Sequence, residues 1–232
     1  MDRAEFDKFA DEYRATHVGN IAISGERPEY FAEYKVRDLV RFYCASPRYI
    51  AAPRVLDFGA GVGTSVPFMR RYMPQGRLTC VDVSSKSLEI GRARFGGEAE
   101  FTLFNGTRVP FPDGSFDIVF AACVFHHIDH REHVALLREL FRVLGSGGFA
   151  FVYEHNPYNP LTRHAVNTCP FDENAHLIPA QSMRRRFVAA GFARPSIRYR
   201  VFFPSVVRGL RRFEPWITWL PFGAQYYVAA SK

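Results

Sequence analysis

The spacing of apolar residues along the chain changes near residue 54. Before that point, apolar side chains recur every three or four residues from Phe6 to Tyr13, as in an amphipathic helix. Pro28 begins a second pattern of this kind, which stops before Pro47. The sequence therefore predicts a helical N-terminal arm over residues 1–50.

From Arg54 onward, short apolar runs alternate with helical patterns. Strands are predicted at residues 54–58, 77–83, 100–104, 117–122, 149–154, 197–203 and 225–230. Helices are predicted at residues 63–73, 85–95, 131–144 and 180–190, the third of them capped by Asp129 with Glu132 three residues on. This alternation predicts an α/β fold with a doubly wound parallel sheet.

Composition narrows the class of protein. The chain has 232 residues, of which 47% are hydrophobic, and this fraction excludes a disordered chain. No apolar run approaches the roughly 18 residues of a membrane-spanning helix, and no signal peptide is visible. The four cysteines form no CxxC pair, which is typical of reduced thiols in the cytosol. We expect a single cytoplasmic domain over residues 1–232, with an arm at 1–50, a core at 51–155 and a third part at 156–232.

The positive charge lies at the C-terminal end. Residues 1–180 hold 20 basic and 22 acidic side chains, whereas residues 181–232 hold 10 basic side chains and one acid, Glu214. The basic cluster at residues 208–212 leads into Trp216 and Trp219. Such a segment suits an anionic membrane surface or a lipid-linked substrate, so the protein could be peripheral to a membrane. RNA binding is an alternative, and so is an apolar insertion that packs on the core or on a dimer partner.

A glycine-rich turn follows the first predicted strand. Asp57 is followed by the spacing G-x-G-x-G at residues 59–63, where side chains would block the approach of a ligand to the backbone. Asp82 lies 19 residues after Gly63, at the end of the second strand, where a carboxylate can accept hydrogen bonds from ribose hydroxyls. The early third glycine and the preceding acid suit a cationic amino-acid moiety better than a pyrophosphate.

The turn and three further segments resemble class I S-adenosylmethionine-dependent methyltransferases. Residues 57–64 resemble the family's first motif, Asp82 matches its ribose-binding acid, and residues 105–107 resemble its adenine-contacting segment. The sequence VPFPDGSFD at residues 109–117 is similar to the LPFPDGSFD stretch of the small-molecule branch, which includes the type 11 and ubiquinone/menaquinone-biosynthesis-like enzymes. Residues 137–148 resemble L-x-E-x-x-R-V-L-x-P-G-G, with Ser146 in place of the proline.

The resemblance, which covers roughly residues 50–155, implies a fold and a cofactor. The fold is a Rossmann-like sheet of seven strands, mostly parallel with a last antiparallel strand, with helices on both faces and an N-terminal helical lid. The cofactor is S-adenosylmethionine, and the product is S-adenosylhomocysteine. The cofactor-binding residues expected are Tyr13, Asp57, Gly59, Ala60, Gly61, Gly63, Asp82, Val83, Asn105, Gly106, Thr107 and Cys123.

Candidate catalytic residues follow the fourth and fifth strands. His127 is the candidate for a general base or for a group that orients the acceptor. The alternative is that one histidine of the pair packs in the core and the other caps the next helix. Glu154, His155 and Asn156 are expected nearest the methyl group, with Glu154 and His155 as catalytic candidates. His126, His130 and His133 have a spacing compatible with metal binding, but a solvated helix start explains them more simply, and we expect no metal.

Two segments are candidates for acceptor binding. A long stretch rich in Pro, Asn and His follows the fifth strand and contains Asn156, Tyr158 and Asn159. The arm resembles the F-D-x-x-A-x-x-Y arm of small-molecule methyltransferases, which makes His17 and Tyr30 lid candidates beside Tyr13.

The sequence thus predicts methyl transfer to O, N or C of a small-molecule acceptor. Asn156-Pro157-Tyr158 resembles the N-P-P-Y motif of nucleic-acid amino methyltransferases, but it follows strand five instead of strand four, which disfavours nucleic acid. An RNA methyltransferase and a non-catalytic cofactor-binding protein remain the alternatives, and the oligomeric state is open.

Overall fold

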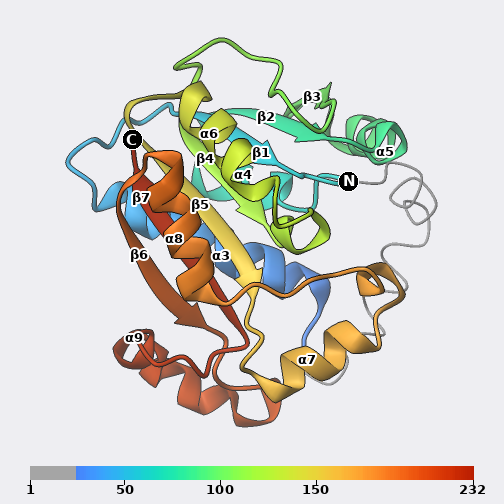
Figure 1. Ribbon diagram of the computed structural model, residues 1–232, viewed down its shortest axis with the longest axis vertical. Helices are drawn as coiled ribbons and strands as arrows, with labels where there is room; N and C mark the ends of the chain where they lie inside the picture. The colour runs from blue at the N-terminus through green and yellow to red at the C-terminus, as the bar shows by residue number, and fades with distance from the viewer. Residues whose placement is uncertain (1–24) are drawn as a thin grey trace.

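One seven-stranded sheet forms the centre of the molecule in the computed structural model, which describes residues 25–232 (Figure 1). Its strands are β1 (Arg54–Phe58), β2 (Arg77–Asp82), β3 (Glu100–Leu103), β4 (Phe116–Ala122), β5 (Leu144–His155), β6 (Ala193–Arg200) and β7 (Gln225–Ser231). Their order in space is β3-β2-β1-β4-β5-β7-β6, and β7 is antiparallel to both of its neighbours whereas the remaining pairs are parallel. The predicted sheet, with its last strand antiparallel, is confirmed.

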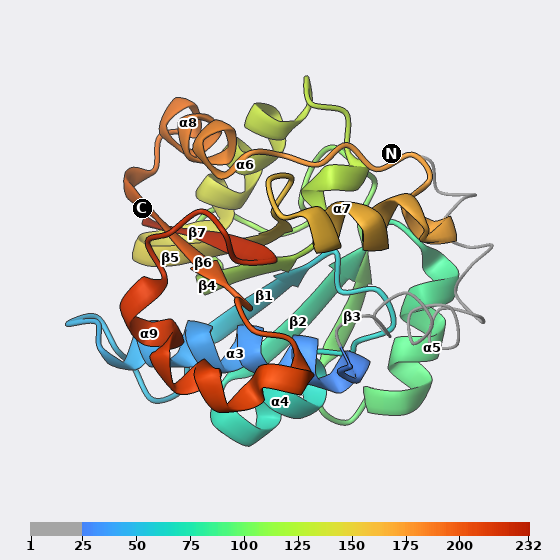
Figure 2. The ribbon, with the colours of Figure 1, turned by 90° about the horizontal axis from the view of Figure 1, so that it is seen from below.

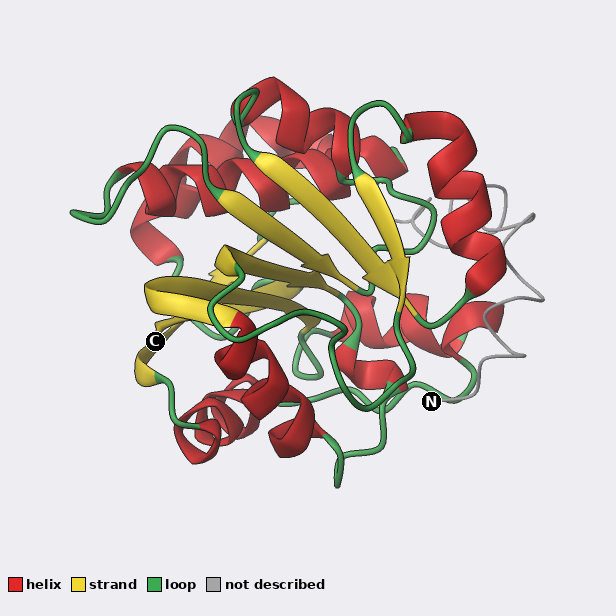
Figure 3. Ribbon diagram, turned by 90° about the horizontal axis from the view of Figure 1, so that it is seen from above, coloured by secondary structure: helices red, strands yellow, loops and turns green. Residues whose placement is uncertain are grey.

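Helices cover both faces of the sheet (Figures 2 and 3). One layer consists of α3 (Pro28–Cys44), α4 (Val66–Tyr72) and α5 (Ser85–Phe95), and the other of α6 (His133–Val143) and α8 (Ala180–Ala190). Two apolar cores result: Leu39 and Met69 are buried in the first, and Leu140 and Phe187 in the second. Each such side chain contributes roughly 1.5–3 kcal/mol through burial. The doubly wound arrangement is therefore confirmed.

The described part of the N-terminal arm belongs to the core. Helix α3 begins at Pro28 as predicted, and its Phe42 ring lies 4.9 Å from the Phe151 ring of β5. The interface also buries Val36 and Leu39 completely. The rest of the arm, with Tyr13, His17 and the lid predicted for them, lies outside the described residues.

The structure corrects several element boundaries. Strand β5 begins at Leu144 instead of residue 149, so the glycines at 145–148, expected to end the preceding helix, lie in the strand, and α4 begins at Val66 instead of residue 63. Helix α6 begins at His133, and Glu132 makes no side-chain cap bond. Asp129 instead accepts a hydrogen bond from Arg131 N in a turn ahead of the helix, so the predicted capping box is wrong. Strand β6 begins at Ala193 because Gly191, at a φ of 104°, ends α8 abruptly and the chain pairs at once with β7.

Two segments at the carboxyl end of the sheet contain helices that the sequence patterns did not predict. The stretch after β5 contains α7 (Pro160–Asn167), which Asn159 caps by accepting a hydrogen bond from Thr162 N. The excursion between β6 and β7 contains the 3₁₀-helical segment η4 (Ser205–Phe213) and α9 (Glu214–Ile217). Among the residues that the structure describes, no helix has both the length and the apolar composition that a bilayer crossing needs. The division into three parts stays a prediction.

Candidate active site

The glycine turn after β1 and the acid after β2 lie together. Gly61 N donates a hydrogen bond to Asp82 Oδ2 at 2.8 Å. The glycines of the turn have positive φ angles, 72° at Gly59 and 77° at Gly63. A Cβ on Gly59 would lie 2.5 Å from the Val124 side chain, whereas a Cβ on Gly61 would meet no atom of the described residues within 4 Å. The backbone is therefore open to a ligand at Gly61 and closely packed at Gly59.

Asp82 offers two carboxylate oxygens at the end of β2. Its Oδ1 accepts a hydrogen bond from Ser84 N at 2.9 Å, and each carboxylate oxygen can accept more than one. The half-buried side chain can thus accept ribose hydroxyls. Val83 beside it lies in the apolar core at 5% exposure, where it can offer only shape to a cofactor. The residues here fit the ribose of S-adenosylmethionine.

Asp57, at the end of β1, is buried with a single hydroxyl partner. Ser65 Oγ donates a hydrogen bond to Asp57 Oδ2. Burial raises the pKa of Asp57 to about 7, because the charged carboxylate loses its hydration while Ser65 compensates only in part. A buried acid in this state can neutralise a cationic amino group that binds next to it.

The segment after β3 forms a tight turn of its own. Asn105 Oδ1 accepts hydrogen bonds from Thr107 N, Thr107 Oγ1 and Arg108 N, and Gly106 has a φ of 89°. The Asn105 carbonyl is therefore committed to the turn. Contact of residues 105–107 with adenine stays a prediction.

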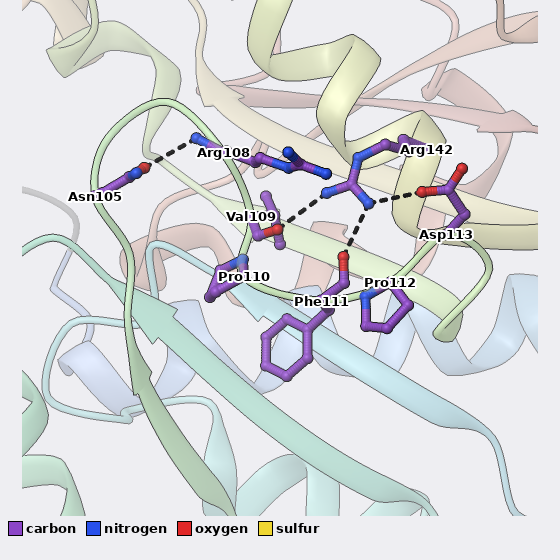
Figure 4. Close-up of a pocket in the computed structure, with 8 residues that line it drawn as sticks. All are labelled: Asn105, Arg108, Val109, Pro110, Phe111, Pro112, Asp113 and Arg142. Carbon is purple, nitrogen blue, oxygen red and sulfur yellow. Dashed lines mark hydrogen bonds and ion pairs between the residues drawn. The ribbon is translucent and has the colours of Figure 1, made fainter.

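Arg142 of α6 holds the following loop in place (Figure 4). Its guanidinium donates to Val109 O, Phe111 O and Asp113 Oδ1 at 2.8–2.9 Å, and also bonds Glu139. This arrangement links two of the sequence motifs. Arg142 belongs to the motif at residues 137–148, and it holds the loop of the VPFPDGSFD motif at residues 109–117 in place. The open groove of about 580 Å³ at this loop is lined by Arg142 and by residues of the loop, among them Asn105 and Arg108.

Cys123 stands directly after β4 in a strained conformation. Its φ is 61°, which is uncommon outside glycine and often marks a functional site. Lys35 Nζ of α3 donates to its Sγ at 3.2 Å, and Gln225 Nε2 of β7 lies 3.9 Å from the same sulfur. Burial would raise the pKa of Cys123, but Lys35 and His155 outweigh it and lower the pKa to about 6. A thiolate and an ammonium thus lie at the predicted cofactor position.

Glu154 and His126 form a buried ion pair behind this point. Glu154 is fully buried and accepts hydrogen bonds from Val124 N at 3.1 Å, Phe125 N at 2.7 Å and His126 Nδ1 at 2.6 Å. Burial disfavours a charged His126, yet the carboxylates of Glu154 and Asp172 raise its pKa to about 10. Glu154 therefore fixes the turn after β4 from below, and this geometry favours a positioning role over contact with an acceptor.

His127 faces the loop that follows α7. Its Nε2 lies 3.5 Å from Asp172 Oδ1, and the same oxygen lies 3.5 Å from His126 Nε2. Burial and the neighbouring His126 cation lower the pKa of His127 to about 3, so its imidazole is neutral at physiological pH. A group with so low a pKa can orient an acceptor by hydrogen bonding but is a weak general base at neutral pH.

The three groups His126, His127 and Asp172 are also those that could hold a metal ion. Their ligand atoms lie within 4.8 Å of one another. His126 in its charged form cannot ligate, and its charge is already balanced by Glu154 and Asp172. His133 of the spacing noted in the sequence bonds Ile128 O and Arg186 instead, and His130 is exposed.

The structure places the predicted acceptor-binding residues in different environments. Asn156 is fully buried and donates to Pro221 O and Gly223 O, and Asn159 caps α7, so both side chains hold backbone. Tyr158 is exposed on the surface, and its contact with an acceptor stays a prediction. Tyr30 packs beside Tyr34 and under the Arg211 guanidinium, 4.7 Å from its ring. His155 stays at the site, 3.3 Å from Gln225 Nε2.

Three residues of the site were not identified from the sequence. Lys35, Gln225 and Asp172 come from α3, β7 and the loop after α7. Lys35 and Gln225 lie 88 and 102 positions from Cys123, so no local spacing links them. The available signal was composition: a lysine among the apolar positions of α3, and an acid in the long segment after β5.

Comparison with known proteins agrees with this geometry. Residues 55–148 match the family model of a methyltransferase domain. Ubiquinone/menaquinone biosynthesis C-methyltransferases UbiE from Hahella chejuensis and Ectopseudomonas mendocina are each 33% identical to the chain, over 128 and 125 residues, or 52% and 51% of it. The chain spans about half the length of these curated relatives, 51% and 48%.

Solved structures resemble the whole fold. An S-adenosylmethionine-dependent methyltransferase from Thermotoga maritima matches with a TM-score of 0.68 at 19% identity, covering 100% of both chains. One from Archaeoglobus fulgidus matches with a TM-score of 0.66 at 15% identity, covering 89% of this chain and 95% of its own. Residues 55–148 therefore match a methyltransferase domain, and the chain as a whole has the fold of S-adenosylmethionine-dependent methyltransferases.

Proposed function

We propose that the protein transfers the methyl group of S-adenosylmethionine to an oxygen, nitrogen or carbon atom of a small-molecule acceptor. The observation that supports this most is the meeting of two groups at one edge of the sheet. The turn held by Asp82 lies at the ends of β1 and β2, and the charged cluster around Cys123 lies at the ends of β4 and β5. Parallel strands present their ligand sites at this edge.

The chain's own residues would divide the work. When bound, S-adenosylmethionine supplies a methyl group made electrophilic by its sulfonium. Asp82 would hold the ribose, and Asp57 with Ser65 would hold the amino-acid moiety. Glu154 and His126 hold the turn after β4 through hydrogen bonds, and a turn fixed in this way would help to orient an acceptor toward a bound cofactor.

The neutral His127 suits an orienting role. Its imidazole can hydrogen-bond a polar group of the acceptor, and in this scheme rate comes from placement more than from proton removal. The curated relatives are named C-methyltransferases, so carbon is the acceptor atom to test first.

Calorimetric titration with S-adenosylmethionine and S-adenosylhomocysteine tests the proposal. Asp82→Ala is expected to weaken binding by about 1–3 kcal/mol through lost hydrogen bonds. Glu89→Ala, an exposed acid on α5, is the matched control and should bind as the wild type does. Absence of binding by both compounds at millimolar concentration refutes the proposal, and unchanged affinity in Asp82→Ala refutes the role of Asp82.

A further inference from the structure

Large apolar side chains are concentrated on one part of the described surface. Of thirteen exposed ones among residues 25–232, nine lie in the segments 158–161 and 206–222. We call these nine the C-terminal apolar surface: Tyr158, Leu161, Val206, Val207, Leu210, Phe213, Trp216, Trp219 and Phe222. Single exposed apolar residues are ordinary, but a gathering of this size marks an interaction site.

The two segments are fastened to each other. Asn159 Nδ2, at the start of α7, donates to Phe222 O at 2.8 Å, and Asn156 Nδ2 donates to Pro221 O at 2.9 Å. The rings of Phe213 and Trp216 lie 5.7 Å apart. Figure 1 shows α7 and the η4–α9 segment along the same lower end of the molecule. Residues 158–161 therefore lie beside the end of the 206–222 segment, which itself contributes seven of the nine side chains.

In the segment 201–224 an acidic side chain is buried and large aromatic side chains are exposed to solvent, which is the opposite of the usual arrangement. Glu214 is buried at 6% exposure and accepts a hydrogen bond from Phe202 N at 2.9 Å. Trp216 and Trp219 are 71% and 68% exposed, and the Trp219 indole N–H is satisfied by Trp216 O. The aromatic rings are thus offered outward, which removes the alternative that this insertion packs on the core.

The outward charge of the segment is positive. Arg208 and Arg212 are exposed, and Glu214, the sole acid after residue 200, faces inward. Among the residues that the structure describes, Arg211 of this cluster pairs with an acid, with its guanidinium 2.7 Å from Glu26. Arginines beside exposed tryptophans are the combination that binds the headgroup region of an anionic bilayer.

The surface borders the candidate active site. The segment leaves the sheet at Arg200, the end of β6, and returns at Gln225, the start of β7. Gln225 is the residue that accepts a hydrogen bond from Tyr34 and contacts Cys123 and His155. The segment that carries most of the C-terminal apolar surface is therefore joined directly to a residue of the Cys123 cluster.

We propose that the C-terminal apolar surface docks on an anionic phospholipid bilayer, with Trp216 and Trp219 in the interface and Arg208 and Arg212 at the phosphates. The docking stands without methyl transfer, whereas the further step, that the acceptor is an amphiphile held in that bilayer, rests on the proposed function. Charge complementarity selects this occupant over a neutral one.

Tryptophan fluorescence offers a direct measurement, because Trp216 and Trp219 are the two tryptophans of the chain. Vesicles of phosphatidylcholine alone are compared with vesicles of equal parts phosphatidylcholine and phosphatidylglycerol, at low and at high salt. We expect a blue shift and co-sedimentation with the anionic vesicles at low salt, and a marked loss of both at high salt.

Matched double variants separate the two contributions. We expect each of two double variants, Trp216→Ala/Trp219→Ala and Arg208→Gln/Arg212→Gln, to weaken partitioning by about tenfold or more. The variant without tryptophans is measured by co-sedimentation. Leu103→Ala/Val188→Ala and Arg77→Gln/Arg94→Gln remove exposed apolar and basic side chains elsewhere and should leave it unchanged.

Three results would overturn the docking: no partitioning into anionic vesicles, equal loss in the control variants, or binding of single-stranded RNA in place of vesicles. Self-association that Trp216→Ala/Trp219→Ala abolishes, without vesicle binding, would assign the surface to a second copy of the chain. Titration with S-adenosylmethionine on each variant keeps the two proposals apart. Lost vesicle binding with intact cofactor binding contradicts only the docking, and the converse contradicts only the proposed function.

Discussion

At the scale of single residues, Cys123 combines a positive φ with a charged partner from a distant helix. Burial alone would raise the pKa of the Cys123 thiol, but the Lys35 ammonium at 3.2 Å lowers it. The pair carries no net charge when the thiol is ionised, which is the condition under which a buried charge is tolerated. A neutral pair of this kind suits a site that receives a positively charged sulfonium.

Replacing the lysine tests this pairing. In a Cys44→Ser background, which removes the other accessible thiol, we expect Cys123 to be alkylated by iodoacetamide with an apparent pKa of about 6. Lys35→Met should raise that pKa, because only the burial remains, and should slow alkylation at pH 7 by about tenfold. Arg41→Met, an exposed cation on the same helix, is the control. An unchanged pH profile in Lys35→Met would contradict the assignment.

Asp57 is a second residue with a perturbed pKa. Burial raises its pKa, whereas the pKa of Cys123 is lowered. The folded protein retains the Asp57 proton up to a pH of about 7, whereas an unfolded chain loses it near 3.8. Between these pH values the folded state binds more protons than the unfolded state, so this residue makes stability fall as the pH rises. The cost of the ionised carboxylate amounts to roughly 4 kcal/mol at most.

Asp57→Asn should therefore melt at a higher temperature than the wild type at pH 8, and the two curves should converge toward pH 4. The same change should weaken S-adenosylmethionine binding at pH 8, because the amide cannot neutralise an amino group. Asp117→Asn provides the contrast. Burial would raise the pKa of Asp117, but its bonds to Arg54 lower it, so its loss should destabilise the protein at pH 8. Equal pH dependence of the two variants would refute this account.

At the scale of elements, Arg142 ties the last turn of α6 to the loop that precedes β4. One planar guanidinium bonds two carbonyls and two carboxylates, which a lysine ammonium cannot span together. The loop lies between the predicted adenine contact and a central strand, so its position affects both.

Arg142→Lys is expected to lower the free energy of unfolding by about 2–4 kcal/mol, because buried carbonyls of the loop lose their donor. Urea denaturation measures this, and limited proteolysis within residues 105–115 reports whether the loop is released. Arg138→Lys, on the same helix with one long bond of 3.3 Å to Ala189 O, should cost far less. Similar losses in both variants would show that the network is not specific.

The central elements could be predicted from the sequence because their own residues determine them. Strands β1, β4 and β5 contain apolar runs at residues 55–56, 118–122 and 149–153, and Ser85 to Phe95 forms α5 as expected. The capping box at Asp129 failed because a competing turn uses the same side chain. Helices α7, η4 and α9 are held by contacts to distant segments, such as Asn156 to Gly223, that no local pattern contains.

The residues of the candidate site also fall into those that local spacing identifies and those that only tertiary contacts bring together. Asp82 and the glycine turn lie 21 positions apart and were found by their spacing, since both belong to one βαβ unit. Lys35, Gln225 and Asp172 reach the site only once α3, β7 and the loop after α7 have packed. Their role follows from tertiary structure, which a single sequence does not display.

At the scale of the whole molecule, positive charge and cofactor chemistry occupy different regions. The net charge of +7 arises within residues 181–232, outside the matched methyltransferase domain at residues 55–148. The groups that face the predicted cofactor are compensated locally, as Lys35 is by Cys123 and His126 by Glu154. Exposed arginines such as Arg208 have no such partner acid in their own segment.

Salt should therefore separate the two properties. Exposed charges are screened over about 10 Å at 0.1 M salt, whereas buried pairs are screened much less. At a cofactor concentration of about 100 times the dissociation constant, S-adenosylmethionine should stabilise the fold by about 2.7 kcal/mol. That corresponds to a rise in Tm of about 5–10 °C for a chain of this size.

We expect this rise to be nearly the same at low and high salt, measured by differential scanning fluorimetry, while partitioning onto anionic vesicles is lost at high salt. Asp82→Ala should reduce the Tm rise and leave partitioning intact. Loss of both properties over the same salt range would mean that the basic segment takes part in cofactor binding, contrary to the separation of charge in the structure.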